Sequence, residues 1–257
     1  LRTVETFACK TRAEPEPIEQ LSLDTDFNFL LMSQWSPRKN IENSLRWWVE
    51  EFIDQNVGLI VKTNMSKNSL VDYRLTSNVL KKVLQEYPDR KCKVYLLHGD
   101  LTSGQLTWLY QHDKVKSMIN ISHGEGFGLP LFESAREALP IITVGWSGQL
   151  DFLRYEDKNY FESVKYELKK VQKEAAIPGL IEAESQWAFA DSGSYKMALR
   201  KTYKNWGKAK KRAERLQTLV NENFNEEKLF QGFCDAVYKP DPELLEWQQN
   251  LDEMETL

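Results

Sequence analysis

Three glycines and two carboxylates near the middle of the chain have the types and spacing that suit ligand binding. Gly124, Gly126 and Gly128 lie within "SHGEGFGLPLFE", although the 257-residue chain has only 12 glycines. Glycine lets a backbone approach a ligand closely and adopt positive φ. Glu125 lies inside this cluster and Glu133 follows eight residues later. Carboxylates accept hydrogen bonds from paired hydroxyls, such as those of a sugar or a ribose.

The residues after the glycines predict an anion site at the start of a helix. Pro130 suits a first helical turn, and the N–H groups that begin a helix bind phosphate readily. The spacing G-x-G-x-G is neither the dinucleotide fingerprint nor a P-loop, which disfavours an NAD-type oxidoreductase. Glu133 alone would be a common acid of a helix N-terminus. The negative charge of Glu125 beside a phosphate site would be unfavourable unless this carboxylate binds a partner of its own.

The elements around this loop alternate between strands and helices. Strands are predicted at 27–33, 57–63, 92–99, 116–122 and 140–146. Helices are predicted at 41–53, 75–84, 106–110, 130–139, 193–206, 207–222 and 226–238, and 160–172 holds one more strand or an extended segment. The strands are apolar on both faces, which predicts an α/β fold with a Rossmann-like parallel sheet, helices on both faces and a helical C-terminal region. Ligands of such sheets bind beyond the carboxyl ends of the strands, where the glycine cluster lies.

Amino-acid composition limits the kinds of partner that we expect this chain to bind. Hydrophobic residues make up 41% of the chain, enough for a sizeable core, and the net charge of −4 disfavours nucleic acid as the main partner. The segment "KAKKRAER" indicates a solvated helix face, with a nucleic-acid patch as the minor alternative. Cys9, Cys92 and Cys234 form neither a disulfide framework nor a metal pattern, so we expect no metal and a cytoplasmic location. No apolar run approaches the roughly 20 residues of a membrane span.

The segment "EGFGLPLFE" resembles the E-x7-E signature of retaining glycosyltransferases with the GT-B fold, in particular family 4 (group 1). The resemblance extends to "LLMSQWSPRKN", "LHGDLTSGQLTWLY", "LPIITVGWSGQLDFL" and "ENFNEEKLFQGFCDAVY" and covers about residues 26–238. The family usually has glycine where this chain has Ala138, a change expected to affect packing more than binding. The matched part of the family is its C-terminal, donor-binding domain.

The resemblance implies roles for individual residues in a nucleotide-sugar site. Glu125 would contact hydroxyls of the transferred sugar, and Glu133 would contact the ribose hydroxyls. Lys39, with Arg38 beside it, would neutralise the diphosphate leaving group, whose developing charge needs fixed positive partners. The backbone around Phe127, Gly128 and Leu129 would hold the diphosphate or sugar, Gly99, Asp100 and Leu101 would border the base, and Ser147, Gly148 and Gln149 would approach the sugar or phosphates. A solvated turn is the alternative for Arg38 and Lys39.

The implied reaction is transfer of a hexose-type sugar from a UDP- or GDP-sugar to an acceptor hydroxyl, with retention and without a cofactor. We expect a linker or remnant at 1–26, the donor-binding domain at 27–240 and a C-terminal helix or tail at 241–257. The acceptor domain of the family would then be missing or supplied by a partner chain, and the isolated domain could be inactive. The acceptor could be a glycan, a lipid or a protein, and self-association is plausible. The alternative function is a non-catalytic nucleotide-sugar binding or regulatory module.

The three histidines are less informative. His123 could be a ligand or an acid beside the loop, and it could equally pack at a strand end. His98 is expected to shape the loop that precedes the base-binding segment, and His112 to lie on the surface.

Overall fold

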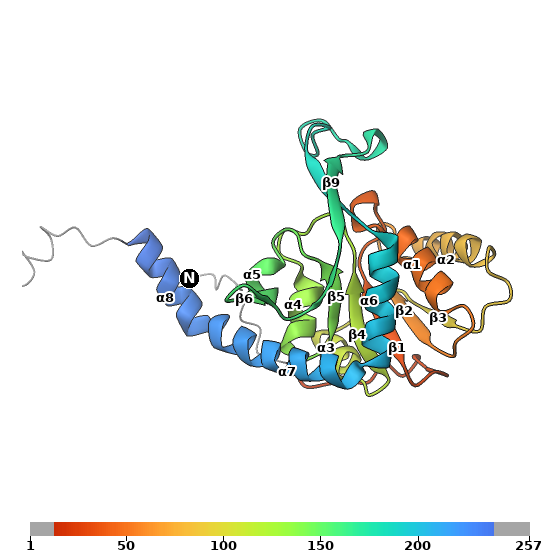
Figure 1. The fold of residues 1–257 in the computed structure, drawn as a ribbon, viewed down its shortest axis with the longest axis horizontal. Coiled ribbons are helices and arrows are strands. Elements are labelled where there is room, and N and C mark those ends of the chain that lie inside the picture. The colour runs from red at the N-terminus through yellow and green to blue at the C-terminus, as the bar shows by residue number, and fades with distance from the viewer. Residues whose placement is uncertain (1–12, 239–257) are drawn as a thin grey trace, which may run out of the picture. The chain divides into compact units, whose positions relative to one another are not determined.

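The computed structural model describes residues 13–238 of the chain (Figure 1). Its contacts divide the chain into a unit spanning 12–220 and a second unit that holds 1–11 and 221–257. Of the second unit, the structure describes the end of α7 (Trp206–Asn223) and α8 (Glu226–Val237). The predicted C-terminal helix at 241–257 lies outside the described residues. Among the described helices, none is long and apolar enough to cross a membrane.

A six-stranded sheet forms the centre of the larger unit. Every neighbouring pair of strands is parallel, in the order β3-β2-β1-β4-β5-β8. The strands are β1 (Asn28–Met32), β2 (Gly58–Lys62), β3 (Lys93–Leu97), β4 (Val115–Asn120), β5 (Ile141–Val144) and β8 (Glu162–Val164). The sequence-based prediction of a parallel α/β sheet is confirmed. Because the strands run the same way, all their carboxyl ends lie at one edge.

Helices cover both faces of this sheet. One face packs against α1 (Ile41–Phe52), α2 (Leu70–Leu84) and α6 (Ser192–Lys204). The other face meets α3 (Ser103–Gln111) and α4 (Leu129–Arg136), and the short α5 (Leu150–Leu153) follows β5. Alternate residues of β1 serve the two faces: Phe29 and Leu31 belong to the core under α1, whereas the Sδ atom of Met32 lies 3.3 Å from the Tyr110 hydroxyl of α3. This double burial explains the continuous apolar runs in the strands.

Two predicted helices differ in detail from the observed ones. Leu75, expected on the buried face of α2, is 55% exposed, and Asp72 is buried instead. The carboxylate of Asp72 accepts hydrogen bonds from the N–H groups of Met65 and Ser66, which pins the start of α2. Helix α4 ends at Arg136 rather than at residue 139. Ala138 has φ +52°, and the N–H of Leu139 bonds back to the carbonyl of Ser134 (2.9 Å), which is the pattern that ends a helix with a left-handed residue.

An antiparallel hairpin, here called the arm, follows the sheet. Strand β9 (Tyr166–Lys170) pairs with β10 (Gln186–Ala190), and the arm rises from the body of the larger unit (Figure 1). Its own small core contains Val171, Ala175 and Trp187. The sequence predicted one strand or an extended segment at 160–172, whereas the structure has two strands there, β8 and β9. A smaller hairpin joins β6 (Arg154–Tyr155) to β7 (Lys158–Asn159).

The segment before β1 packs against the rest of the larger unit. The N–H of Glu16 donates to the carbonyl of Gly104 (3.1 Å), and the N–H of Asp24 donates to the hydroxyl of Tyr95 (3.0 Å). Ile18 is buried. The division of the chain into 1–26, 27–240 and 241–257 stays a prediction.

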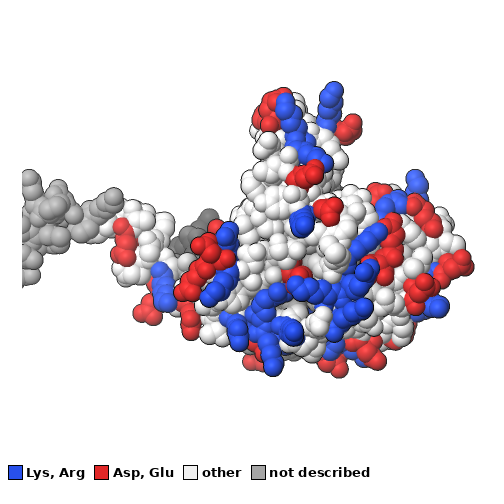
Figure 2. Space-filling view, in the orientation of Figure 1, with Lys and Arg blue, Asp and Glu red and all other residues white. Residues whose placement is uncertain are grey.

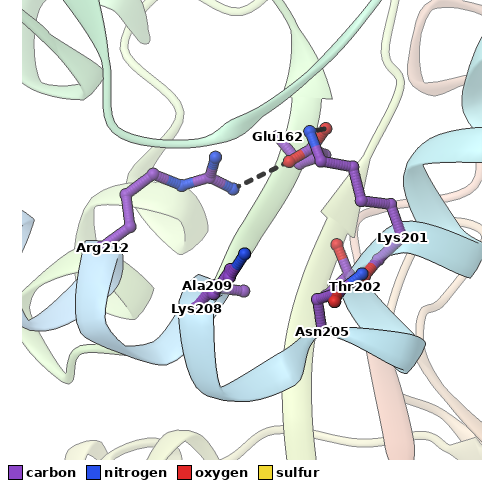
Figure 3. Close-up of a pocket in the computed structure, with 7 residues that line it drawn as sticks. All are labelled: Glu162, Lys201, Thr202, Asn205, Lys208, Ala209 and Arg212. Atoms are coloured by element: carbon purple, nitrogen blue, oxygen red, sulfur yellow. Dashed lines mark hydrogen bonds and ion pairs between the residues drawn. The ribbon is translucent and has the colours of Figure 1, made fainter.

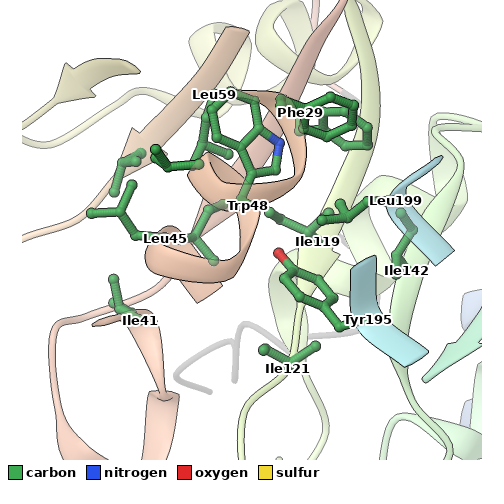
Figure 4. Close-up of a cluster of buried hydrophobic side chains, with 14 of the residues drawn as sticks. Phe29, Ile41, Leu45, Trp48, Leu59, Ile119, Ile121, Ile142, Tyr195 and Leu199 are labelled. Carbon is green, nitrogen blue, oxygen red and sulfur yellow. The ribbon is translucent and has the colours of Figure 1, made fainter. Parts of the chain in front are cut away.

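The largest core lies between the sheet and α1 (Figure 4). Trp48 is fully buried there and meets Phe29 edge-on at a ring-centroid distance of 6.2 Å. Leu45 packs one turn before Trp48, and Tyr195 of α6 closes the cluster. The i, i+3, i+4 spacing of the apolar residues of α1 therefore anchors the helix that follows the β1 loop, where Arg38 and Lys39 lie.

We predict that Leu45→Ala lowers the free energy of unfolding by about 2–5 kcal/mol, because it removes buried methyl groups and leaves a cavity. Leu75→Ala is the matched control, since Leu75 is 55% exposed and Leu45 is fully buried. Urea denaturation of both variants measures the difference. Equal losses in the two variants would contradict the assignment of α1 to the core.

Candidate nucleotide-binding site

The residues predicted for the site gather at the carboxyl edge of the sheet. Arg38 and Lys39 follow β1, Gly99 to Leu101 follow β3, the glycine loop follows β4, and Ser147 and Gly148 follow β5. Strands β1 and β4 are neighbours, which brings the Arg38–Lys39 turn next to the loop. The N–H of His123 donates to the carbonyl of Arg38 (2.8 Å) and joins the two segments.

The side chain of Glu125 makes several polar contacts at the carboxyl edge of the sheet. Its two carboxylate oxygens lie 2.7 and 2.6 Å from Lys39 Nζ, and Arg38 Nη1 lies 3.4 Å from Oε2. Asn120 Nδ2 and Ser122 Oγ donate to Oε1 at 3.1 and 2.9 Å. The side chain of Glu125 is only 6% exposed. Glu125 was predicted to contact the sugar and Lys39 the diphosphate. In this structure the two side chains are bound to each other.

The electrostatics of Glu125 follow from these partners. Burial by itself would raise the pKa of this carboxyl. The charge of Lys39 and the hydrogen bonds from Lys39, Asn120 and Ser122 lower the pKa, and together they outweigh the effect of burial. The pKa of Glu125 is lowered as a result, so the group is ionised at neutral pH. An ionised carboxylate that is paired with a cation offers fixed hydrogen-bond acceptors and does not act as a proton donor.

The glycine loop offers backbone donors to a ligand. Of its three glycines only Gly128 has positive φ, at +86°, and it caps the N-terminus of α4. Our expectation of positive φ at Gly124 and Gly126 is therefore wrong. Within the described residues, the N–H groups of Gly126, Gly128 and Leu129 have no hydrogen-bond acceptor. No atom lies within 4 Å of a Cβ built on Gly126, so a ligand can approach the backbone there.

The turn after β5 holds this loop in place. Ser147 Oγ donates to the carbonyl of Glu125 (2.6 Å) and accepts from its N–H (3.2 Å), and the N–H of Gly148 donates to the same carbonyl (3.0 Å). Ser147 has φ +80°, an uncommon conformation that the surrounding contacts must enforce. A Cβ on Gly148 would lie 1.9 Å from the carbonyl oxygen of Gly126. Glycine is therefore required at 148 by close packing against the loop.

Glu133 lies one turn into α4 and contacts the other helix on that face. Tyr110 of α3 donates its hydroxyl to Glu133 Oε2 (2.8 Å). Burial, followed by the charge of Glu133, raises the pKa of Tyr110 well above its usual value, so the hydroxyl keeps its proton. This bond fixes one carboxylate oxygen of Glu133 beside the start of α4.

A cavity of about 280 Å³ lies at the same edge. It is bordered by Met32 at the end of β1, Gln34 after it, Lys62 of β2, Asp100 and Leu101 after β3, and Pro130 of α4, among others. The structure thus brings the predicted base segment to the N-terminal turn of α4. Lys62 Nζ donates to the carbonyl of Gly99 (2.6 Å), and burial lowers the pKa of Lys62 against the opposing charge of Asp100.

A different cavity, of about 240 Å³, lies among basic side chains of α6 and α7 (Figure 3). Lys201 and Arg212 both pair with Glu162, at 2.6 and 3.1 Å. Figure 2 shows the basic side chains of α6 and α7 gathered on one face. This cavity shares no lining residue with the glycine loop. Within "KAKKRAER", Lys208, Lys211 and Arg215 are exposed, as expected of a solvated helix face.

Four residues with clear contacts at the site are missing from the sequence-based prediction. The sequence pattern gives Lys62, Asn120 and Ser122 only as strand residues, and Tyr110 only as a residue of a helix core. Polar residues in buried strands are a signal that could have marked Asn120 and Lys62, since buried polar groups need partners. Nothing in the sequence pairs Tyr110 with Glu133. Conversely, Gln149 is fully buried and donates to the carbonyl of Val144, so its side chain supports the turn.

The histidines occupy three different settings. His98 Nε2 lies 3.1 Å from Asp72 and helps to shape the loop after β3. His112 Nδ1 accepts a hydrogen bond from the N–H of Lys114 (3.0 Å), and its side chain is 18% exposed. His123 is buried beside the arm. Within the described residues, no group of three or more His, Cys, Asp or Glu side chains could hold a metal ion.

Comparison with solved structures identifies the fold. Sucrose-phosphate synthase from Thermosynechococcus elongatus matches with a TM-score of 0.58 and 18% identity over 84% of this chain and 46% of its own. The Anabaena protein HepE (Alr3699), in complex with UDP-glucose, matches with a TM-score of 0.54 and 12% identity over 83% of this chain and 49% of its own. No family model matches the sequence, and no curated protein matches it.

A third match is to an isolated C-terminal domain. The C-terminal domain of LpcC, a group 1 glycosyl transferase family protein from Francisella tularensis, matches with a TM-score of 0.51 and 14% identity over 79% of this chain and 88% of that domain. The chain therefore has the α/β fold of the C-terminal domains of GT-B glycosyltransferases. It spans about half the length of the first two proteins.

We predict that Glu125→Gln lowers the free energy of unfolding by about 1–3 kcal/mol at pH 7, because Lys39 loses its charged partner. The pKa of Glu125 is lowered in the folded state. Its stabilisation is therefore present above the unfolded pKa, roughly 4.3, and is lost as pH falls through the folded value. Urea denaturation should show the gap between wild type and variant closing below about pH 4. A gap of constant size from pH 7 to pH 3 would contradict the ion pair.

We predict that Gly148→Ala displaces the glycine loop, because the new Cβ would overlap the carbonyl of Gly126. The matched control is Gly145→Ala, whose Cβ would come no closer than 3.5 Å to another atom. Amide hydrogen exchange at Glu125, whose N–H donates to Ser147 Oγ, measures the effect: faster exchange is expected in the Gly148 variant alone. Unchanged exchange in both variants would show that the turn after β5 does not hold the loop.

Proposed function

We propose that this chain is the donor-binding part of a glycosyltransferase that transfers a sugar from a UDP- or GDP-sugar to an acceptor hydroxyl, with retention of configuration. The observation that carries the proposal is the glycine loop, whose free N–H groups at the start of α4 lie next to the Lys39–Glu125 pair. A helix N-terminus with unpaired donors and nearby cations suits a diphosphate. The fold of the GT-B C-terminal domain supports the same assignment.

The arrangement suggests how each part acts. The diphosphate would bind at the N–H groups of Gly126, Gly128 and Leu129, and Arg38, 39% exposed, is the accessible cation. Lys39 is bonded to Glu125, so an incoming phosphate would compete with the carboxylate for it. Contact with the phosphate would free one Glu125 oxygen for a sugar hydroxyl. The leaving diphosphate gains positive partners that already lie at the loop, which lowers the barrier to departure.

The nucleoside would occupy the cavity after β1 and β3. Asp100 and Leu101 border this cavity, as the resemblance implies for the base, and Pro130 places it at the start of α4. Glu133, held by the Tyr110 hydroxyl beside the start of α4, would accept hydrogen bonds from the ribose hydroxyls. Two carboxylates eight residues apart, one in the loop and one in the helix, would then hold the two ends of one nucleotide-sugar.

A second candidate function is a nucleotide-sugar binding module without its own turnover. The chain spans about half the length of sucrose-phosphate synthase and HepE, which favours a need for a further domain or partner chain. The two functions share the donor site and differ in whether sugar transfer occurs. Hydrolysis or transfer assays with UDP- and GDP-sugars, alone and with candidate acceptors, separate them.

We predict that UDP or GDP raises the thermal stability of the chain, whereas CMP does not. A ligand that binds only the folded state at a hundredfold excess over Kd stabilises it by about 2.7 kcal/mol. Glu133→Gln should abolish most of the shift while leaving an acceptor for the Tyr110 hydroxyl, so the apo protein stays folded. Glu137→Gln, one turn further along the chain, is the control. A full shift in the Glu133 variant, or no shift with any nucleoside diphosphate, would contradict the proposed site.

A further inference from the structure

A cavity of about 360 Å³ lies between the segment after β1 and the arm, and none of the roles above uses it. Its wall includes Trp35 and Asn43 on one side and Gln172 and Phe189 of the arm on the other, with His123 between them. Pockets for small molecules usually combine aromatic walls with a few polar groups and start at roughly 300 Å³. The cavity has this composition and size.

His123 presents a hydrogen-bond acceptor at this cavity. The residue is 4% exposed, and its Nδ1 lies 2.8 Å from the carbonyl oxygen of Ala188. A carbonyl only accepts, so Nδ1 carries the hydrogen. Burial lowers the pKa of His123, against the opposing effect of that hydrogen bond, so the ring is neutral at pH 7. Nε2 then keeps its lone pair, and no donor among the described residues bonds to it.

The aromatic residues of the arm fix the orientation of this ring. Trp187 stacks on His123 with ring centroids 5.3 Å apart and an interplanar angle of 15°. Phe189 lies 4.3 Å from the same ring. The N–H of Ala188 donates to the carbonyl of His123 (3.0 Å), so backbone and side chain are both attached to the arm. An acceptor atom held this rigidly is suited to recognition of a hydroxyl or N–H donor.

The remaining polar groups of the cavity are neutral or neutralised. Asn43 donates through Nδ2 to Asn40 (2.8 Å), which leaves its own Oδ1 as an acceptor. Gln172 is exposed, and in the described part of the chain only its backbone carbonyl has a partner, the N–H of Ala175 (2.9 Å), so its side-chain amide is available. Glu42 is the charged residue of the wall and pairs with Arg46 (2.9 Å). Amides and a neutral imidazole beside aromatic faces match a sugar ring, which has hydroxyls at its rim and C–H groups on its faces.

The cavity adjoins the proposed donor site. His123 is next to Gly124 in the chain and two residues before Glu125, and its N–H bonds to the carbonyl of Arg38. A molecule in the cavity would therefore share a wall with the loop that receives the transferred sugar.

We propose that this cavity binds one sugar ring of the acceptor substrate, with His123 Nε2 accepting a hydrogen bond from a ring hydroxyl and Gln172 and Asn43 contacting others. The assignment of the ring to an acceptor rests on the proposed glycosyltransferase function. The acceptor is accordingly a glycan or a glycosylated molecule, and the arm contributes directly to its selection.

Saturation-transfer NMR on the full chain tests this with the methyl glycosides of glucose, galactose, mannose and N-acetylglucosamine. At least one glycoside should bind and shift the His123 Nε2 resonance. Gln172→Ala should weaken that binding about fivefold, the change expected for one lost neutral hydrogen bond. Lys173→Ala is the matched control, since Lys173 is the exposed neighbour of Gln172 and does not line the cavity. Phe189→Leu, which removes the aromatic face, should weaken binding further.

Two results would overturn the proposal: no glycoside perturbs the His123 ring, or the Gln172 and Phe189 variants bind as the wild type does. UDP binding measured on the same samples separates this proposal from the proposed donor function. Retained UDP binding without any glycoside binding would reject the acceptor cavity alone. Glycoside binding that depends on Gln172 without UDP binding would leave a carbohydrate site and reject the donor site.

Discussion

The buried ion pair between Lys39 and Glu125 is the contact on which the site depends. It joins the segments that follow the neighbouring strands β1 and β4, and Glu125 is almost fully removed from water. Burying a carboxylate is costly unless charge and hydrogen bonds compensate, which Lys39, Asn120 and Ser122 do here. Their positions require the parallel register of the sheet and the packing of α1 beneath the turn. The core and the site are thus linked through one pair of charges.

The ion pair also helps to hold the glycine loop in a defined conformation. A loop with three glycines would be free to move, but its backbone at Glu125 is held by Ser147 and Gly148, and its side chain by Lys39. The N–H groups at the start of α4 remain open to an anion. A phosphate that contacts Lys39 would change the partners of Glu125, so donor binding and the presentation of this carboxylate are coupled. The arm, attached through His123, borders the same loop from the other side.

The sequence predicted the architecture well because continuous apolar runs and helical periods are local signals. It placed every strand of the sheet through β5 and located the glycine loop at the carboxyl edge. It missed the second strand after residue 160, because the polar run of β9 pairs with β10, sixteen residues beyond its end, rather than with the sheet. It also left Lys62, Tyr110, Asn120 and Ser122 without roles. The contacts of Lys62 with Gly99 and of Tyr110 with Glu133 join residues distant in sequence, which periodicity does not reveal. Asn120 and Ser122 contact Glu125 close by in the chain, but only the turn of the loop after β4 brings their side chains to it.

The most direct test of the account follows the backbone N–H groups of the glycine loop by NMR while UDP or GDP is added. The account predicts that the amide resonances of Gly126, Gly128 and Leu129 shift first and saturate together, with the side chain of Lys39 responding at the same concentrations. Shifts confined to the basic cavity of Lys201 and Arg212, or no shift in the loop at saturating nucleotide, would contradict the claim that this loop binds a nucleoside diphosphate.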